Sequence, residues 1–447
     1  MRSKLKLCFV LLLIGFIRIA AQDQNAPFVI SLDDAIKLAL EKNWDVKLSE
    51  KDILRADEQI SEAYANAFPR LEFNGRYVRN IKLPVLFLPS GTPFNESGKT
   101  MTLELGSDNA YDLTFSLSQV IYSQKVNTAI QIADEYSELS KTANLSTRND
   151  IILNVKKAFY NVLLMQELVK VSRQGNEVAK ANYENVSALF KQGVASEYDF
   201  LRAEVQFANT QPMLIQTENN LELAKNYLKN ILTLDITQPI EIRGEFVFEE
   251  VPGSLLESAN EKGVREHPLV KQLEIQSSLL DKNITIQRAD YFPTLAAFGS
   301  YAFQAQDNTF NFKDYLWAES FMVGLNLSYT LFDGFGRSAR IEQAIIDKEK
   351  VDLTRRKVEE GLKIRIMQAK MSMDEAKKRI DAQTKSLEQA DKALKIAQTR
   401  YKSGVGTQLE LIDTQAAMTI ARTNYAQAIY DYLTAKADWE NAVSIEY

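Results

Sequence analysis

The 447-residue sequence contains one cysteine and one histidine. Cys8 lies in an N-terminal segment that resembles an export signal, so the exported chain has neither a disulfide nor a thiolate nucleophile. His267 directly precedes Pro268, and we expect it to begin a helix rather than act as a base. No His/Glu spacing typical of a metal site and no phosphate-binding glycine loop accompanies it. The sequence therefore predicts no enzyme, no metal and no cofactor.

Long apolar runs are also missing, apart from the segment at the N-terminus. Basic residues precede an apolar stretch of about eleven residues, which is too short to span a bilayer of roughly 30 Å, and small residues follow it. We predict that residues 1–21 are a signal peptide that is removed. The loss of its four basic residues changes the formal net charge from −6 to −10, which disfavours nucleic acid as a partner.

Residues 366–401 contain an apolar stripe in which every third or fourth position is apolar or small, with one Gln. This spacing is typical of a long helix that packs against another helix along its length. A turn with two glycines follows, and Thr407 with Glu410 has the pattern of a capping box that begins a second helix. The stripe consists of Ile366, Ala369, Met373, Ala376, Ile380, Gln383, Leu387, Ala390, Leu394, Ala397 and Tyr401.

The same pattern occurs 211 residues earlier, so the chain contains an internal duplication. Gly193-Val194 matches Gly404-Val405, and Ser196 matches Thr407. Each repeat has the order helix, helix, strand, strand, long helix, returning helix. We place the first repeat at residues 31–232, a linker at 233–253 and the second repeat at 254–445. The strands are expected at about 71–78, 111–121, 295–303 and 321–331, with residues 79–110 as a long loop.

The four expected strands alternate between apolar residues and residues that are mostly small or polar, and aromatic residues gather near both ends. This pattern suits tilted membrane strands whose ends lie at two interfaces. Four strands cannot close a barrel wide enough for a channel, so several subunits must contribute. A soluble sheet with one wet face is an alternative. A periplasmic coiled-coil scaffold is another, but it leaves the amphipathic strands without a role.

Short motifs in this order, found twice, resemble the TolC family of outer-membrane efflux proteins over nearly the whole mature chain. They are Ser31-Leu32-Asp33-Asp34-Ala35, Ala67-Phe68-Pro69-Arg70-Leu71, Tyr291-Phe292-Pro293-Thr294-Leu295, Leu331-Phe332-Asp333-Gly334 and the two Gly-Val turns. The resemblance implies a mainly α-helical homotrimer that shares a twelve-stranded β-barrel in the outer membrane and extends a helical tube into the periplasm. It also implies an exit duct that works with a periplasmic adaptor and an inner-membrane transporter. The cargo leaves no motif in such a duct.

The resemblance further implies roles for particular residues. The hairpin tips that dock the adaptor match Gly193, Val194, Ala195, Ser196, Gly404, Val405, Gly406 and Thr407. Acidic residues that surround the periplasmic pore entrance match Glu410 and Asp413. Residues that latch neighbouring helices match Asp199 and Tyr401, whereas a latch arginine of the family is replaced by Gly406. We therefore expect the acidic ring to be kept and the latch to differ.

Overall fold

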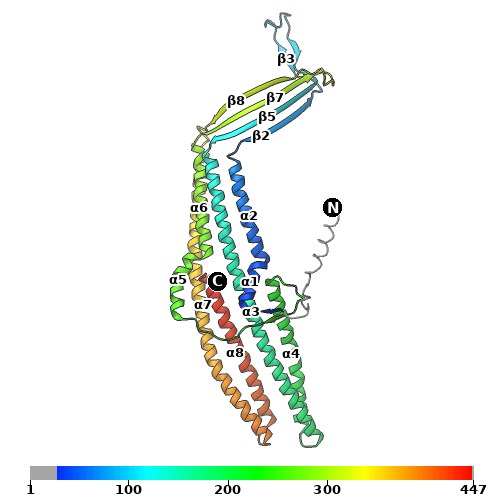
Figure 1. The fold of residues 1–447 in the computed structure, drawn as a ribbon, viewed down its shortest axis with the longest axis vertical. Helices are drawn as coiled ribbons and strands as arrows, with labels where there is room; N and C mark the ends of the chain where they lie inside the picture. The colour runs from blue at the N-terminus through cyan, green and yellow to red at the C-terminus, as the bar shows by residue number, and fades with distance from the viewer. Residues whose placement is uncertain (1–27, 445–447) are drawn as a thin grey trace, which may run out of the picture. The chain divides into compact units, whose positions relative to one another are not determined.

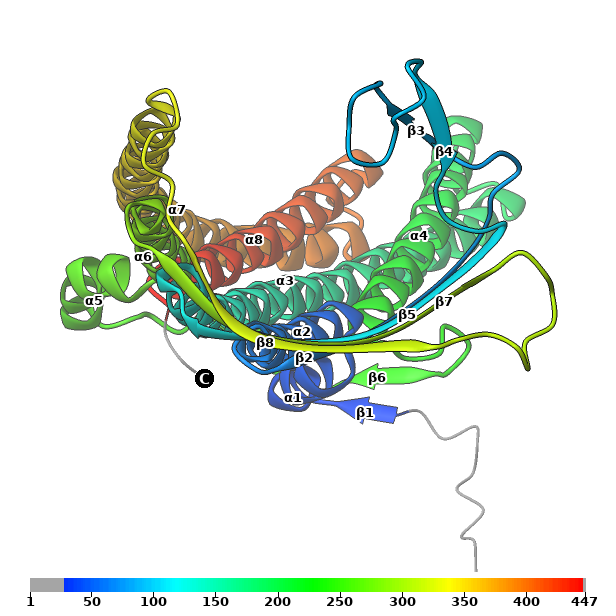
Figure 2. The same cartoon turned by 90° about the horizontal axis from the view of Figure 1, so that it is seen from above.

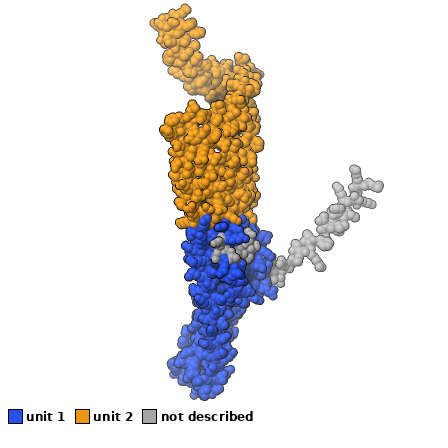
Figure 3. All heavy atoms as spheres, turned by 90° about the vertical axis from the view of Figure 1, so that its left-hand side faces the viewer, with its two compact units in different colours: residues 1–49, 145–268, 359–447 blue, residues 50–144, 269–358 orange. Residues whose placement is uncertain are grey.

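The computed structural model describes residues 28–444, apart from the side chains of residues 258–261. The expected signal peptide and the last residue of the expected second repeat lie outside this range. The chain divides into two compact units, which Figure 3 shows in blue and orange. Unit 1 comprises residues 1–49, 145–268 and 359–447, and unit 2 comprises residues 50–144 and 269–358.

Two helical hairpins contain the expected tips. In the first, α3 (Gln124–Lys191) is followed by α4 (Glu197–Ile231), and in the second, α7 (Gly336–Lys402) is followed by α8 (Gln408–Ala442). Figure 1 shows both connecting turns at its lower end. The apolar stripe of residues 366–401 is buried or half-buried at every member. The 3.6-residue spacing of the sequence therefore located these helices and their packed faces correctly.

Unit 1 also contains the elements that join the two repeats. The short strands β1 (Phe28–Ile30) and β6 (Ile240–Ile242) pair in parallel, and α1 (Leu32–Lys42) packs with them on α3 and α4. The expected linker at 233–253 thus contains a strand that no pattern in the sequence indicated. After it, α5 (Gly253–Glu266) approaches the end of α8 closely, because a Cβ at Gly263 would lie 2.8 Å from the Val443 backbone.

Unit 2 contains a four-stranded antiparallel sheet in the order β2-β5-β7-β8. The strands are β2 (Arg70–Arg79), β5 (Asn109–Tyr122), β7 (Thr294–Asp307) and β8 (Ala318–Ser328). β8 ends three residues before the expected position 331, because its partner β7 begins at Thr294, opposite Ser328. The helices that lead to the sheet are α2 (Trp44–Ala65) and α6 (Pro268–Arg288), and the short 3₁₀ helix η1 (Ala289–Tyr291) follows α6.

Residues 79–110 are not the featureless loop that the sequence suggested. They contain a second hairpin, β3 (Val85–Leu88) and β4 (Met101–Glu104), paired in antiparallel register. Proline and glycine at its ends concealed it, because these residues are typical of turns and are rare within strands.

The two faces of the four-stranded sheet differ in chemistry. Large apolar side chains on one face are exposed in the described chain: Leu71, Phe73, Phe115, Leu117, Phe321, Val323, Leu325 and Leu327. The opposite face has polar residues such as Glu72, Asn74, Thr114 and Ser116 at positions in between. A continuous exposed apolar face of this extent marks a surface that meets another apolar phase.

None of the helices within residues 28–444 has an apolar stretch long enough to traverse a bilayer.

Candidate functional site: the hairpin tips

The two hairpin turns have the same backbone geometry. Gly193 and Gly404 end their helices with φ angles of 71° and 73°, which glycine adopts without steric cost. Val194 N–H donates to the Leu189 carbonyl at 2.9 Å, and Val405 N–H donates to the Arg400 carbonyl at 3.0 Å. The two turns that match in sequence are therefore closed by equivalent hydrogen bonds, which fix the backbone of both.

The helices that return from the turns begin with matching caps. The hydroxyls of Ser196 and Thr407 each accept a hydrogen bond, at 3.2 Å, from the backbone N–H three residues on, at Asp199 and Glu410. The Ser196 hydroxyl also donates to the Asp199 carboxylate at 2.6 Å. These bonds satisfy N–H groups at the helix starts that would otherwise lack partners.

Each turn presents an exposed valine. The side chains of Val194 and Val405 are 72% and 70% exposed, although their backbones are held by the bonds described above. An apolar side chain on a rigid backbone loses little conformational entropy when a partner covers it. The two tips therefore have the properties of preorganised apolar contact points.

Gly406 is required by the local packing. A Cβ at this position would lie 2.9 Å from both the Arg400 Cβ and the Tyr401 nitrogen. The corresponding residue of the first turn is Ala195, so the two turns differ at this point. A side chain as large as the arginine expected from the family pattern does not fit here without a change in the backbone.

Both expected acidic residues of the entrance are exposed, and the structure pairs one of them with an arginine. Glu410 lies 3.5 Å from the Arg400 guanidinium of the same chain, and Arg400 also donates to the Val405 carbonyl at 3.4 Å. Asp413, one turn along α8, is exposed. Both carboxylates are on the first two turns of one helix, but Arg400 offsets part of their charge.

The two expected latch residues are brought near each other. Burial raises the pKa of Tyr401, and the negative charge of Asp199 raises it further. Tyr401 therefore keeps its proton and remains a hydrogen-bond donor well above neutral pH. The Asp199 carboxylate accepts a hydrogen bond from the Ser196 hydroxyl and the Asp199 N–H donates one back to it, so Asp199 also fixes the start of α4.

Three features of the tips were not found from the sequence. Arg400 was not recognised as the partner of Glu410, since the sequence located the turn between them but not the direction in which side chains leave it. The side chain of Gln408 is 6% exposed, and its amide has no hydrogen-bond partner within the described part of the chain. Stacked rings close the first hairpin near its tip, with Phe190 and Phe200 centred 5.1 Å apart and Tyr183 and Phe207 5.8 Å apart.

His267 lies between α5 and α6, at the C-terminal cap of one and directly before the first residue of the other. Burial lowers the pKa of its imidazole to about 4, and the nearby Arg365 contributes. It is therefore neutral at physiological pH. Within the residues that the structure describes, no group of three or more His, Cys, Asp or Glu side chains is arranged to hold a metal ion.

A family model described as outer membrane efflux protein matches residues 35–233 and 264–443. The chain belongs to this family. The two matched segments correspond to the two repeats, and both hairpin tips lie within them. The family consists of efflux channels of the outer membrane rather than enzymes.

Two curated relatives cover most of the chain. The alkaline protease secretion protein AprF of Pseudomonas aeruginosa is 22% identical over 420 residues, which are 92% of this chain and 83% of that protein. The outer membrane protein TolC of Vibrio cholerae is 19% identical over 371 residues, 82% of this chain and 83% of that protein. A relative named for efflux is also similar: the probable efflux pump outer membrane protein TtgC of Pseudomonas putida is 21% identical over 398 residues, 86% of this chain and 77% of that protein.

Solved structures of outer-membrane channels share the fold. The Campylobacter jejuni CmeC channel superimposes with a TM-score of 0.76 at 16% identity, covering 92% of this chain and 85% of that one. The open state of the Neisseria gonorrhoeae MtrE channel gives 0.70 at 18% identity, covering 92% and 88%. The TolC-like fold, the outer-membrane location and the channel function expected from the sequence are confirmed, and the scaffold alternative is not supported.

Proposed function

We propose that three copies of this outer membrane efflux protein close their sheets into one twelve-stranded barrel, which is the exit duct of a tripartite export system. The observation that carries the proposal is the sheet itself. In the described chain β2 and β8 each have a single strand neighbour, so both edges of the sheet are open. Pairing of β8 with β2 of the next copy removes every edge, as a membrane sheet requires.

The chemistry of the faces supports the same assembly. Closure places the exposed apolar face, with residues such as Phe73 and Leu325, against outer-membrane lipid. It places Glu72, Asn74 and Thr114 toward an aqueous lumen. Three copies also bring together six hairpin tips with their exposed valines. We assign these tips to docking of a periplasmic adaptor, which connects the duct to an inner-membrane transporter.

The oligomeric state tests this proposal. Washing membranes with carbonate or urea is expected to leave the protein in the membrane. Protein extracted in detergent is expected to have the mass of three chains. The measurement is light scattering on the purified protein, with the detergent contribution subtracted. A chain that is monomeric and stays in solution without detergent would contradict the barrel.

The periplasmic entrance is proposed to be acidic. A three-fold axis repeats Glu410 and Asp413, giving six carboxylates around a narrow opening, of which Arg400 neutralises part. We expect a trivalent cation added on the tip side to block single-channel conductance. Glu410→Gln with Asp413→Asn is expected to weaken the block at least about tenfold, because close unit charges interact by about 1 kcal/mol or more.

The matched control for the entrance changes the charge in the opposite direction. Arg400→Gln removes the cation beside Glu410, so it is expected to strengthen the block by the trivalent cation. Glutamine at position 410 retains the ability to complete the capping box with Thr407, so the acidic double variant is expected to assemble normally. Unchanged block in the double variant would place the constriction elsewhere in the duct.

A further inference from the structure

The β3–β4 hairpin follows β2 and has a defined structure of its own. At its tip, Asn95 is 3% exposed, and its side-chain amide donates to the Leu88 and Lys99 carbonyls, both at 2.7 Å. The oxygen of the same side chain accepts a 2.6 Å bond from the Ser97 hydroxyl. At its base, Leu105 N–H donates to the Pro84 carbonyl at 2.9 Å. The segment therefore has a defined shape at both ends.

One face of this hairpin is entirely apolar. The register pairs Leu86 with Leu103 and Leu88 with Met101, so these four side chains share a face. Leu86, Met101 and Leu103 are each more than 40% exposed, and Phe94 at the tip is 81% exposed. A two-stranded hairpin is marginally stable in water, and an uncovered apolar face adds to the cost. This face needs a cover that residues 28–444 of one chain do not provide.

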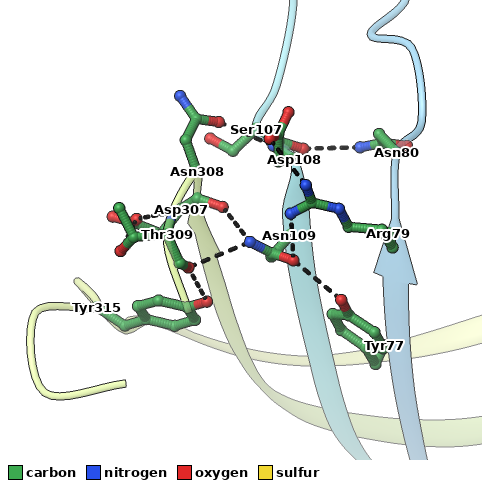
Figure 4. Close-up of polar contacts among 10 residues, drawn as sticks. All are labelled: Tyr77, Arg79, Asn80, Ser107, Asp108, Asn109, Asp307, Asn308, Thr309 and Tyr315. Carbon is green, nitrogen blue, oxygen red and sulfur yellow. Dashed lines mark hydrogen bonds and ion pairs between the residues drawn. The ribbon is translucent and has the colours of Figure 1, made fainter. Parts of the chain in front are cut away.

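The base of the hairpin is fixed to the sheet by a polar cluster around β5 (Figure 4). Asn109 is fully buried, and its oxygen accepts hydrogen bonds from Tyr77 and Arg79, both at 2.9 Å. Arg79 also pairs with Asp108 at 3.1 Å, and the Asn80 amide donates to the Ser107 carbonyl at 2.8 Å. The direction in which the hairpin leaves the sheet is therefore set by hydrogen bonds.

The same cluster also holds the loop between β7 and β8, because β7 is the neighbour of β5 opposite β2. The Asn109 amide donates to the Asp307 and Thr309 carbonyls, both at 3.1 Å. Aromatic rings of this loop then pack on the apolar face, with Phe312 and Tyr315 each within 5.5 Å of the Tyr111 ring centre. Figure 2 shows this loop on the convex side of the curved sheet, whereas the β3–β4 hairpin lies over the concave side.

In a closed barrel the concave side encloses the lumen, so the hairpin projects over the outer mouth of the duct. Twelve strands about 4.8 Å apart and tilted by about 40° form a barrel with a radius of roughly 12 Å. An extended strand rises about 3.3 Å per residue, so residues 85–94 reach up to about 30 Å. A moderate inward lean is enough for hairpins from three copies to meet on the axis.

We propose that the β3–β4 hairpins of three copies pack their apolar faces together and cover the outer mouth of the duct. This inference rests on the trimer of the proposed function.

Two features favour copies of this chain as the partner that covers the apolar face. The hairpin segment has two lysines and two glutamates, Lys82, Lys99, Glu96 and Glu104, so its formal charge is zero and three copies do not repel one another. Pro84 and Pro89 border β3 and disfavour addition of a foreign strand to its edge, which leaves the apolar face as the contact surface.

Single cysteines test this contact, because the only native cysteine lies in the expected signal peptide. Two variants are made separately, Phe94→Cys at the tip and Leu103→Cys on the apolar face. Membranes that contain either variant are treated with a short bismaleimide, which cross-links thiols that lie close together. We expect each trimer to give one covalent dimer and one free subunit, because three thiols pair only two at a time. Phe312→Cys is the matched control, since its side chain is also exposed but lies on the convex side, and it is expected to give no covalent dimer.

A third variant separates contact from chance collision. Leu86→Lys added to Phe94→Cys places three positive charges in the apolar contact, and the covalent dimer is expected to disappear while the trimer persists. The mass in detergent is measured in parallel. If the trimer is intact and neither Phe94→Cys nor Leu103→Cys yields a covalent dimer, the proposed contact between hairpins is refuted and the trimeric duct is not. A monomer overturns the trimer itself, and the cover with it.

Discussion

An exported protein with Val194→Asp and Val405→Asp will reach the outer membrane at normal levels but will not support export. Both side chains are at least 70% exposed on glycine-containing turns, so their replacement leaves the fold intact. Burial of one valine is worth about 1.5 kcal/mol or more. Over the six tips of a trimer, the change from valine to a carboxylate is expected to weaken adaptor binding on the order of a thousandfold.

The measurement uses a host in which deletion of this gene reduces export. Each variant is expressed in that host, and the extent to which it restores export is compared with that of the unmodified protein. Val205→Asp is the matched control, because Val205 is 58% exposed on α4 but lies away from the turn. It is expected to restore export fully. Full recovery by the double tip variant, with equal trimer in the membrane, would remove the tips from the docking surface.

Loss of one partner of the Lys156–Glu440 pair will strongly destabilise unit 1. The two side chains lie 2.6 Å apart and are 4% and 14% exposed. Burial lowers the pKa of Lys156, and the charge of Glu440 opposes that shift. Lys156→Met leaves a nearly buried carboxylate without this partner, which is expected to cost about 3–5 kcal/mol. Lys156→Met with Glu440→Leu is expected to recover most of the loss, because no unpaired charge remains.

The neighbouring residues provide a matched control for this prediction. Lys157 and Asp438 join the same two helices at the same 2.6 Å separation, but their side chains are 39% and 42% exposed. Lys157→Met is therefore expected to cost no more than about 1 kcal/mol. Urea unfolding followed by circular dichroism in detergent compares the variants. Equal losses for Lys156→Met and Lys157→Met would mean that burial does not determine the effect.

Most of the helical architecture could be predicted from the sequence, because it depends on regular spacing. The apolar stripe ending at Tyr401 defined α7, and the 211-residue repeat located α3 and both turns. Alternation located the four strands of the sheet for the same reason. These features are local, so they leave a pattern in a single stretch of chain.

What escaped prediction depends on contacts between distant residues or on short elements. β3 and β4 have four residues each, too few to show a period, and Pro84 and Pro89 border β3. The ion pair between Arg400 and Glu410 arises only when the turn folds back. Asn109 occurs in the sequence as one more polar residue at a strand start. Its central position in the polar cluster becomes visible only when β2 and the β7–β8 loop are brought to its sides.

The parallel pair of β1 and β6 determines when the start of the mature chain can fold. Phe28 pairs with Ile240, which is 212 residues later, so the first residues to leave the export machinery wait until nearly half of the chain has followed. Closing a loop of this length costs roughly 5 kcal/mol of chain entropy by the logarithmic loop relation. The N-terminus is thus left open to periplasmic chaperones and proteases during export, and its protection marks a chain in which α3, α4 and β6 have already come together around it.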